Sequence, residues 1–363
     1  MNKRIEKLLN NIETEGIIIT NPVNMFYLSG FDGEGFCYIS PEEKVIFTDS
    51  RYTVQAKGEA PGFDIVEGFY DKLKDFISEG KEVSVEAGSL SYNQYLKLEK
   101  LGFKLKNTWS IVEKQREIKD SDEIELICTA TDILKETAEM FDTICPGTTE
   151  SALANLIEFN MKSYSFAQIG FETIVAFGEN AACPHHKPTD RVLNEGEIVK
   201  IDYGVSYKHY NADVTRTVFV GKPDQKFKDI YNIVKDAKAL AIDAIKPGVM
   251  GSEIDKTARD YIAKYGYGDC FGHSLGHGIG LECHDSGSLS MRSETELQPG
   301  FVTSVEPGIY IEGWGGVRLE DDIVVTQKGA FNMTKEIRQY DWSNAKELKL
   351  LEKKTKIEIN KFC

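Results

Sequence analysis

The chain has 363 residues, a length that suggests about two domains of roughly 150 residues each. Hydrophobic residues make up 41% and charged residues 28%, which excludes disorder, a collagen repeat or a disulfide-rich mini-protein as a description of the whole chain. The formal net charge of −15 repels a phosphate backbone, and no basic patch is large enough to overcome that repulsion, so nucleic-acid binding is not expected.

The apolar runs and the cysteines exclude further classes of protein. The longest apolar runs, such as Gly16–Thr20, fall far short of the roughly 20 residues that span a bilayer. Charges interrupt the N-terminal segment MNKRIEKLLNN, so we expect no signal peptide. The seven cysteines are scattered and form no CxxC pair, which favours reduced thiols over disulfides or structural zinc. The sequence therefore predicts a cytoplasmic protein without a membrane or nucleic-acid partner.

The first part of the chain alternates short helices and strands. Ile5, Leu8 and Leu9 recur at helical spacing. The expected strands are Ile17–Thr20, Phe36–Ser40, Lys44–Asp49 and Glu82–Glu86, and the expected helices are Tyr70–Ser78 and Tyr92–Leu101. We expect an α/β domain over residues 1–117, and this stretch contains no histidine.

The second part contains a weak internal repeat. A helix over Ser121–Asp142, which Asp120 or Ser121 can cap, leads to Pro146-Gly147. A helix over Gln225–Ile245 leads to Pro247-Gly248, 101 residues after the first such pair. Each is followed by another helix, a histidine-bearing segment and two β-runs with carboxylates. We expect one α+β domain over residues 118–340, its two halves related by a pseudo-two-fold axis. A Lys-rich tail over residues 341–363 is expected to form a solvated helix.

Four carboxylates lie in apolar β-runs of the second part: Asp202, Asp213, Glu306 and Glu320. A hairpin turning symmetrically around Tyr207–Lys208 would place Asp202 directly opposite Asp213, and a turn centred on Gly313 would place Glu306 opposite Glu320. Opposed carboxylates, with Cβ atoms about 5 Å apart, need a proton or a cation between them. Four negative charges match two divalent cations, with one histidine completing the site. The alternative, that these are surface acids, weakens because all four lie in apolar runs.

All six histidines fall between residues 185 and 284. The Gly-rich segment Gly272–Gly280 carries His273 and His277, and its backbone can approach a metal closely while leaving room for a substrate. His284 follows, and the neighbouring Asp285 offers a carboxylate to orient its ring. His209 lies in the turn of the first hairpin and is expected to be exposed.

Several segments resemble the signature blocks of the pita-bread metallopeptidases, a family that includes aminopeptidase P, prolidase and methionine aminopeptidase. These segments are KIDYGVSYKHYNADVTRT, GHSLGHGIGLECHD, SVEPGIY and GVRLEDD. NPVNMFYLSGF and FTDSRYTVQA resemble the creatinase-like N-terminal domain of the first two members. The resemblance covers about residues 1–335. It implies a creatinase-like domain followed by a pita-bread catalytic domain, and a homodimer.

The resemblance also implies roles for individual residues. The implied metal ligands are Asp202, Asp213, His277, Glu306 and Glu320, with Asp213 and Glu320 bridging two metal ions. The implied catalytic residues are His185, which contacts the substrate near the metals, His284, which stabilises the tetrahedral intermediate, and Glu306, which moves a proton. His273, Tyr310 and Arg318 match residues that line a proline-side pocket, whereas His186 has no implied role. The oxygen-rich ligand set suits Mn²⁺, and Co²⁺, Fe²⁺ or Zn²⁺ are also compatible.

The expected reaction is hydrolysis of the Xaa-Pro bond at the N-terminus of peptides through a metal-bridged hydroxide, as in aminopeptidase P. The alternative is a prolidase, which is restricted to Xaa-Pro dipeptides and closes the site beyond the proline. We favour the first because the N-terminal blocks look more like short bacterial aminopeptidase P-like chains. Creatinase shares both domains but lacks the metal ligands. A non-enzymatic binding protein on the same fold is a remote alternative.

Overall fold

The computed structural model describes residues 3–342 of the chain, and these residues belong to two compact units, 1–116 and 117–363. The helix expected in the Lys-rich tail lies outside the described residues. Each unit has its own β-sheet structure and its own apolar core.

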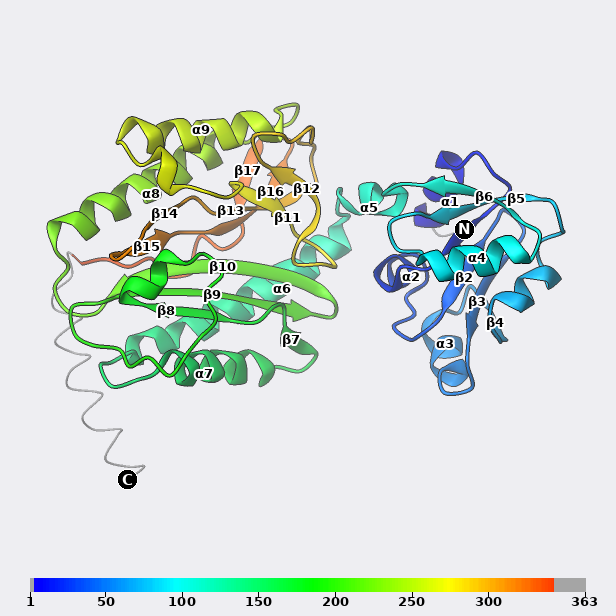
Figure 1. Ribbon diagram of the computed structural model, residues 1–363, viewed down its shortest axis with the longest axis horizontal. Coiled ribbons are helices and arrows are strands. Elements are labelled where there is room, and N and C mark those ends of the chain that lie inside the picture. The colour runs from blue at the N-terminus through cyan, green and yellow to red at the C-terminus, as the bar shows by residue number, and fades with distance from the viewer. Residues whose placement is uncertain (1–2, 343–363) are drawn as a thin grey trace, which may run out of the picture. The chain divides into compact units, whose positions relative to one another are not determined.

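The first unit is built on one six-stranded mixed sheet (Figure 1). Its strands follow the order β4-β3-β2-β1-β5-β6, with β2 antiparallel to both β1 and β3 and the remaining pairs parallel. The strands are β1 (Ile17–Ile19), β2 (Phe36–Ile39), β3 (Lys44–Thr48), β4 (Asp64–Glu67), β5 (Glu82–Glu86) and β6 (Lys104–Thr108). The helices are α1 (Lys3–Asn11), α2 (Pro22–Ser29), α3 (Thr53–Glu59), the 3₁₀ helix η1 (Tyr70–Asp75), α4 (Tyr92–Lys100) and α5 (Ile111–Arg116).

Local sequence explains where the helices of this unit begin and end. The Asn21 side chain accepts hydrogen bonds from the backbone N–H groups of Val23 and Asn24, and Pro22 occupies the first helical position, so α2 begins there. Gly30 ends α2 with a φ of +84°, a conformation that glycine adopts without strain. The α/β class expected for this part is confirmed, although the expected helix over Tyr70–Ser78 is a shorter 3₁₀ helix.

The second unit contains two larger sheets, each with a pair of helices on its outer face, and a separate two-stranded sheet of Gly308–Ile311 and Gly315–Arg318. The first half comprises α6 (Ser121–Ala138), η2 (Glu139–Thr143), α7 (Glu150–Lys162), β7 (Ala167–Ile169), β8 (Ile174–Phe177), η3 (Gly178–Ala182), β9 (Ile198–Tyr207) and β10 (Tyr210–Phe219). The second half comprises α8 (Gln225–Ala244), α9 (Gly251–Lys264), η4 (Gly268–Cys270), β11 (Gly276–Gly278), β12 (Asp285–Leu289), β13 (Val302–Val305), β14 (Gly308–Ile311), β15 (Gly315–Arg318), β16 (Asp321–Thr326) and β17 (Gly329–Asn332).

Figure 1 shows α6 and α7 on one side of the β7–β10 sheet and α8 and α9 on the far side of the β11–β17 strands. The first sheet has the order β10-β9-β7 with β8 also paired to β9, and the second has the order β12-β11-β13-β16-β17. Strands β10 and β16 contact each other, so the two sheets face one another across the middle of the unit.

Matched backbone hydrogen bonds confirm the internal repeat. Gly147 donates to the Leu193 carbonyl over 3.0 Å, and Gly248 donates to the Leu297 carbonyl over 2.8 Å. Leu193 and Leu297 in turn donate to the residues that follow these two glycines. Both glycines have left-handed backbone, with φ of +97° and +85°, which explains the glycine in each Pro-Gly pair. The two halves therefore repeat the same turn at an offset of about one hundred residues.

The β9–β10 hairpin has a different register from the one expected. Asp202 pairs with Thr215 and Asp213 pairs with Gly204, so the two aspartates are diagonal neighbours on one face and not direct partners. The reason is that the turn consists of Lys208 and His209, both with positive φ, and not of Tyr207–Lys208. In the second half, Val305 pairs with Asp321 and Gly308 with Arg318, which agrees with the expected turn centred on Gly313.

Side chains along the strands alternate between the apolar core and the space between the two sheets. Val199, Ile201 and Val214 are buried with Leu134 of α6 and Ile157 of α7, so the intervening residues of β9 and β10 face the opposite sheet. In the second half the buried cluster contains Phe227 of α8, Ile254 of α9, Phe301, Val305 and Ile323. The even-numbered residues of β13 and β16 therefore also face inward. The space between the two sheets receives side chains from both.

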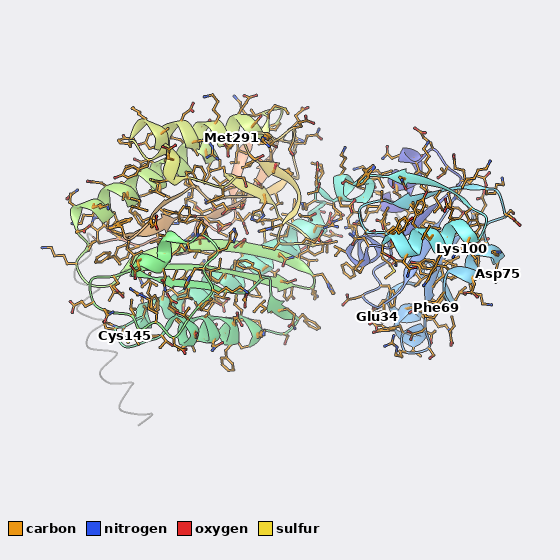
Figure 2. All side chains as sticks on the ribbon, viewed as in Figure 1. Glu34, Phe69, Asp75, Lys100, Cys145 and Met291 are labelled. Carbon is orange, nitrogen blue, oxygen red and sulfur yellow. The ribbon has the colours of Figure 1, made fainter. Side chains whose placement is uncertain are left out.

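Phe69 and Met291, each 66% exposed, are examples of apolar side chains on the outside (Figure 2). The six cysteines in the described part of the chain are free thiols. Among residues 3–342, no helix combines the length and the apolar character that crossing a membrane requires.

Candidate metal centre and active site

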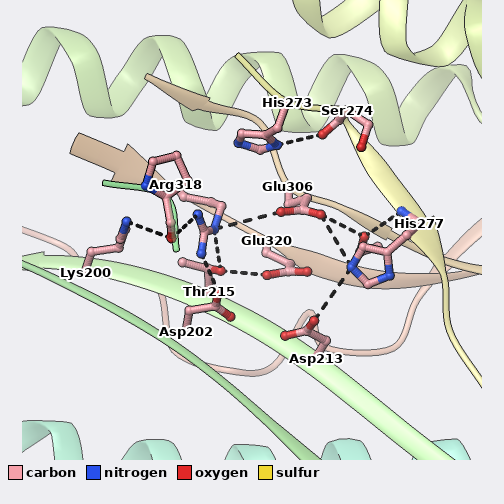
Figure 3. Close-up of polar contacts among 12 residues, drawn as sticks. Lys200, Asp202, Asp213, Thr215, His273, Ser274, His277, Glu306, Arg318 and Glu320 are labelled. Carbon is pink, nitrogen blue, oxygen red and sulfur yellow. Dashed lines mark hydrogen bonds and ion pairs between the residues drawn. The ribbon is translucent and has the colours of Figure 1, made fainter. Parts of the chain in front are cut away.

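Four carboxylates meet between the two sheets (Figure 3). Asp202 and Asp213 come from the inner face of the β9–β10 hairpin, Glu306 directly follows β13, and Glu320 directly precedes β16. Asp202, Asp213 and Glu320 are 7%, 4% and 1% exposed. Potential ligand atoms of Asp213, His277 and Glu320 all lie within 4.8 Å of one another. The structure thus brings together the five residues that the resemblance implied as metal ligands.

Several carboxylate oxygens in this cluster lack any hydrogen-bond partner among the described residues. These buried atoms are Asp202 Oδ1, Asp213 Oδ1 and Glu320 Oε1, together with Oδ1 of the neighbouring Asp322. A buried carboxylate oxygen without a donor is costly, whereas a hard cation is a natural partner for it. The orphaned oxygens therefore fit a site for divalent metal ions.

His277 has the geometry of a metal ligand. Its Nδ1 lies 3.1 Å from the Gly278 carbonyl, which can only accept, so Nδ1 carries the proton. The free lone pair on Nε2 then faces Glu306 Oε1 at 3.5 Å and Asp213 Oδ2 at 3.8 Å. Burial and the adjacent His284 lower the pKa of His277 to about 4, which keeps the ring neutral. An uncharged imidazole whose lone pair faces two carboxylates is the form that binds a cation.

Burial, followed by the charges of neighbouring acids, raises the pKa values of three of these carboxylates. Burial, and then the charge of Glu320, raise the pKa of Asp213 well above its usual value. Burial and Glu306 do the same for Glu320. Burial raises the pKa of Glu306 to about 8 despite the opposing charge of Arg318. Without a cation, these acids cannot all ionise at neutral pH, and cations of high charge would restore their ionised state.

A hydrogen-bonded chain extends from the carboxylates toward a second region. Arg318 forms an ion pair with Asp202 and donates to the Tyr310 hydroxyl over 2.8 Å. That hydroxyl lies 2.9 Å from His273 Nε2, and His273 Nδ1 lies 2.7 Å from the Ser274 carbonyl. Nδ1 must therefore donate to Ser274, and Tyr310 donates to Nε2. Burial, followed by the charge of Arg318, lowers the pKa of His273 to about 4, so the ring is neutral.

Two histidines implied as catalytic lie at the edge of this cluster. The His284 ring is 4.2 Å from the His277 ring, centroid to centroid, and it is exposed. His185 is also exposed, and it follows Pro184, whose carbonyl accepts from Arg318 over 3.3 Å. Both are thus accessible to a substrate that reaches the carboxylates.

Sequence reasoning missed three polar residues of the site. Thr215 donates to Glu320 Oε2 over 2.6 Å and accepts from Arg318 Nε over 3.0 Å. Asp322 accepts the backbone N–H of Asp213 over 2.8 Å. Cys283 Sγ lies 3.4 Å from Asp213 Oδ2. The alternation of side chains along a strand could have identified two of them. Thr215 and Asp322 follow Asp213 and Glu320 by two positions, so they face the same side as these acids.

His209 lies away from this chemistry, in the exposed turn between β9 and β10. We expect His209→Ala to leave kcat/KM and the thermal unfolding midpoint nearly unchanged, because turn residues at the surface contribute little to packing or catalysis. Steady-state kinetics on the metal-loaded variant and a melting curve check this. A large loss of activity would contradict the assignment.

Comparisons with known proteins identify relatives along nearly the whole chain. The model of metallopeptidase family M24 matches residues 125–327, and that of the creatinase/prolidase N-terminal domain matches residues 2–118. An Xaa-Pro dipeptidase from Pyrococcus furiosus is 37% identical over 347 residues, which cover 93% of this chain and 99% of the relative.

Solved structures give a similar result. A structure described as an Xaa-Pro dipeptidase from Bacillus anthracis has a TM-score of 0.88 at 38% identity and covers 92% of this chain and 97% of its own. One described as an X-Pro aminopeptidase from Thermotoga maritima has a TM-score of 0.85 at 35% identity, covering 93% and 99%. The fold expected from the sequence is confirmed by these likenesses.

Proposed function

The chain belongs to metallopeptidase family M24, and we propose that it is an Xaa-Pro dipeptidase, which hydrolyses the bond before proline in dipeptides. The names of several relatives support this choice over the aminopeptidase P activity favoured by the sequence. The observation that carries the proposal is the cluster of orphaned buried carboxylates with a neutral His277, in a chain whose dipeptidase relatives align over more than 90% of its length.

The proposed metal ligands are Asp202, Asp213, His277, Glu306 and Glu320, which together would hold two divalent ions. When bound, such ions polarise a carbonyl oxygen and make a water molecule acidic enough to ionise at neutral pH. Oxygen-rich ligation favours Mn²⁺. The resemblance supports a homodimer as the working form.

Glu306 is the proposed proton carrier. Its Oε1 lies 3.4 Å from Ser304 Oγ and its Oε2 lies 3.9 Å from Arg318 Nε, so the carboxylate is held near the other acids. The nitrogen of an Xaa-Pro bond has no hydrogen and must gain a proton before proline can leave. We assign to Glu306 the transfer of a proton from the attacking water to that nitrogen.

The proposed roles of the remaining side chains follow from their exposure and partners. His284 donates a hydrogen bond to the oxygen on which negative charge develops, because it is exposed beside His277. His185 contacts the bound dipeptide. Four of the five N–H groups of Arg318 already donate to Pro184, Tyr310, Asp202 and Thr215. Arg318 therefore orients Tyr310 and Asp202, and with His273 these residues border the proline side chain.

A series of substrates of increasing length tests the proposed specificity. We expect an Xaa-Pro dipeptide to have a kcat/KM about 10–100 times that of a tripeptide and a pentapeptide with the same first residue. The reason is that a dipeptidase gains a charge-assisted interaction with the free proline carboxylate, worth about 1.5–3 kcal/mol. Kinetics of the metal-reconstituted protein measure the ratio.

One result of this substrate series would contradict the proposal. Comparable rates for the three lengths would return the assignment to an aminopeptidase of the kind named for the Thermotoga maritima structure. An Xaa-Ala dipeptide serves as the control for proline specificity, and absence of hydrolysis of every Xaa-Pro substrate by the metal-loaded protein would refute the function altogether.

A further inference from the structure

Two buried side chains of opposite charge contact the segment that carries His185. This segment, residues 177–189, leaves β8, forms the 3₁₀ helix η3 and then has no regular secondary structure up to Thr189. Glu150 of α7 and Lys200 of β9 are both fully buried, and both direct their charged atoms to it. Backbone without a ladder or helix needs other hydrogen-bond partners, and these two side chains supply them.

Glu150 accepts hydrogen bonds from both ends of the segment. Its Oε1 accepts from the Phe177 backbone N–H over 2.8 Å and from Asn180 Nδ2 over 2.9 Å. Its Oε2 accepts from the N–H and the hydroxyl of Thr189, over 3.0 and 2.6 Å, and lies 2.9 Å from His186 Nε2. Burial alone would raise the pKa of Glu150, but the hydrogen bonds from Thr189, His186 and the others lower it overall. His186 thus has a structural partner that the sequence did not reveal.

Lys200 donates hydrogen bonds to carbonyl groups in the middle of the same segment. Its Nζ donates to the carbonyls of Ala181, Cys183 and Pro184 over 3.2, 2.6 and 3.3 Å. An ammonium group has three hydrogens, so each carbonyl can receive one. The Pro184 carbonyl also accepts from Arg318, which is paired with Asp202. The residue before His185 is therefore connected to the proposed metal centre through Arg318.

We propose that Glu150 and Lys200 are positioning residues, which hold residues 177–189 so that His185 faces the dipeptide bound at the metal centre. This inference rests on the proposed function for the role of His185, while the restraint on the segment stands by itself. Glu150 accepts hydrogen bonds from N–H groups of the segment, and Lys200 donates hydrogen bonds to its carbonyl groups. Removing either charge leaves buried polar groups without partners and lets the segment move.

The second half of the repeat holds its own histidine segment in a comparable way. Asp255 of α9, also fully buried, accepts the backbone N–H of Leu275 over 3.1 Å and pairs with Arg259. Arg259 donates to the carbonyls of Phe271 and His273, each over 2.8 Å. A helix-borne acid and a nearby cation thus fix each segment that presents a histidine.

A double-mutant cycle tests whether Glu150 acts through His185. We expect Glu150→Gln to lower kcat/KM for an Xaa-Pro dipeptide by about 10²-fold, since a displacement of about 1 Å can cost that much. His185→Ala should show a similar loss, and the double variant should be no worse than His185→Ala alone, with bound metal unchanged throughout. The matched control is Glu172→Gln, because Glu172 pairs with Lys187 of the same segment but is exposed. Losses that multiply in the double variant would overturn the proposal.

Hydrogen exchange gives a readout that does not depend on activity. In the metal-free protein, Glu150→Gln should speed exchange of the Phe177 and Thr189 amides at least tenfold, whereas Glu172→Gln should not. Thr189→Val, which removes one donor at an exposed position, should give a smaller increase and provides a second variant if Glu150→Gln does not fold. Unchanged exchange in these variants would refute the restraint. An inactive wild-type protein with the expected exchange pattern would refute the dipeptidase function alone.

Discussion

Removal of divalent cations with a chelator is expected to abolish hydrolysis of Xaa-Pro substrates and to lower the thermal unfolding midpoint. The four clustered carboxylates have raised pKa values or orphaned oxygens, so the folded chain without cations bears their mutual repulsion. A cation at one hundred times its Kd stabilises the folded state by about 2.7 kcal/mol. For a unit of this size that corresponds to a rise of about 5–10 °C in the midpoint.

Elemental analysis, kinetics and melting curves before and after chelation measure these effects. About two ions per chain should be bound, and adding Mn²⁺ back should restore both activity and stability. The control for the chelator itself is its metal-saturated form, which should have no effect. Active protein that contains no metal would contradict the proposed centre.

Glu306→Gln is expected to lower kcat by about 10²–10⁴-fold, the range for loss of a general acid–base group. The amide has nearly the same shape but cannot carry the proton from water to the proline nitrogen. KM should change much less, because the group is assigned to the transition state and not to ground-state binding. Kinetics on protein of known metal content measure both parameters.

Glu312→Gln is the matched control, because Glu312 is an exposed acid in the turn that follows β14. It should retain wild-type kcat. If Glu306→Gln keeps its metal and its turnover, the proton must be carried by another group, and the role of Glu306 would be limited to ligation. A variant that loses metal is distinguished by its elemental analysis.

Much of the site was predictable because metal chemistry restricts residue types. Carboxylates within apolar β-runs are unusual enough to single out Asp202, Asp213, Glu306 and Glu320 from the sequence, whereas the choice of His277 among the histidines came from the family resemblance. The hairpin register was not predictable, since it depends on which residues adopt positive φ in the turn. Lys208 and His209 do so, although neither is a glycine. Shifting the turn by one position changed the direct partner of Asp202 to Thr215.

Side chains that act on neighbours were harder to find than those that act on metals. Glu150 looks in the sequence like an ordinary acid in the first turn of a helix, where negative charge is common. Its partners lie between 27 and 39 residues away in the chain. Lys200, in an apolar strand, similarly gives no sign that three carbonyls of a preceding loop surround it. Only tertiary structure reveals such residues.

The distribution of the proposed ligands over two repeats also bears on synthesis of the protein. Asp213 and Glu320 are 107 positions apart, and Glu320 comes from the last strands described. At about 5–20 residues per second, the ribosome adds the second residue about 5–20 s after the first. Until then the nascent chain lacks Glu320, one of the five proposed ligands. The growing polypeptide is therefore latent as a peptidase until the strands of the second half of the repeat have been synthesised.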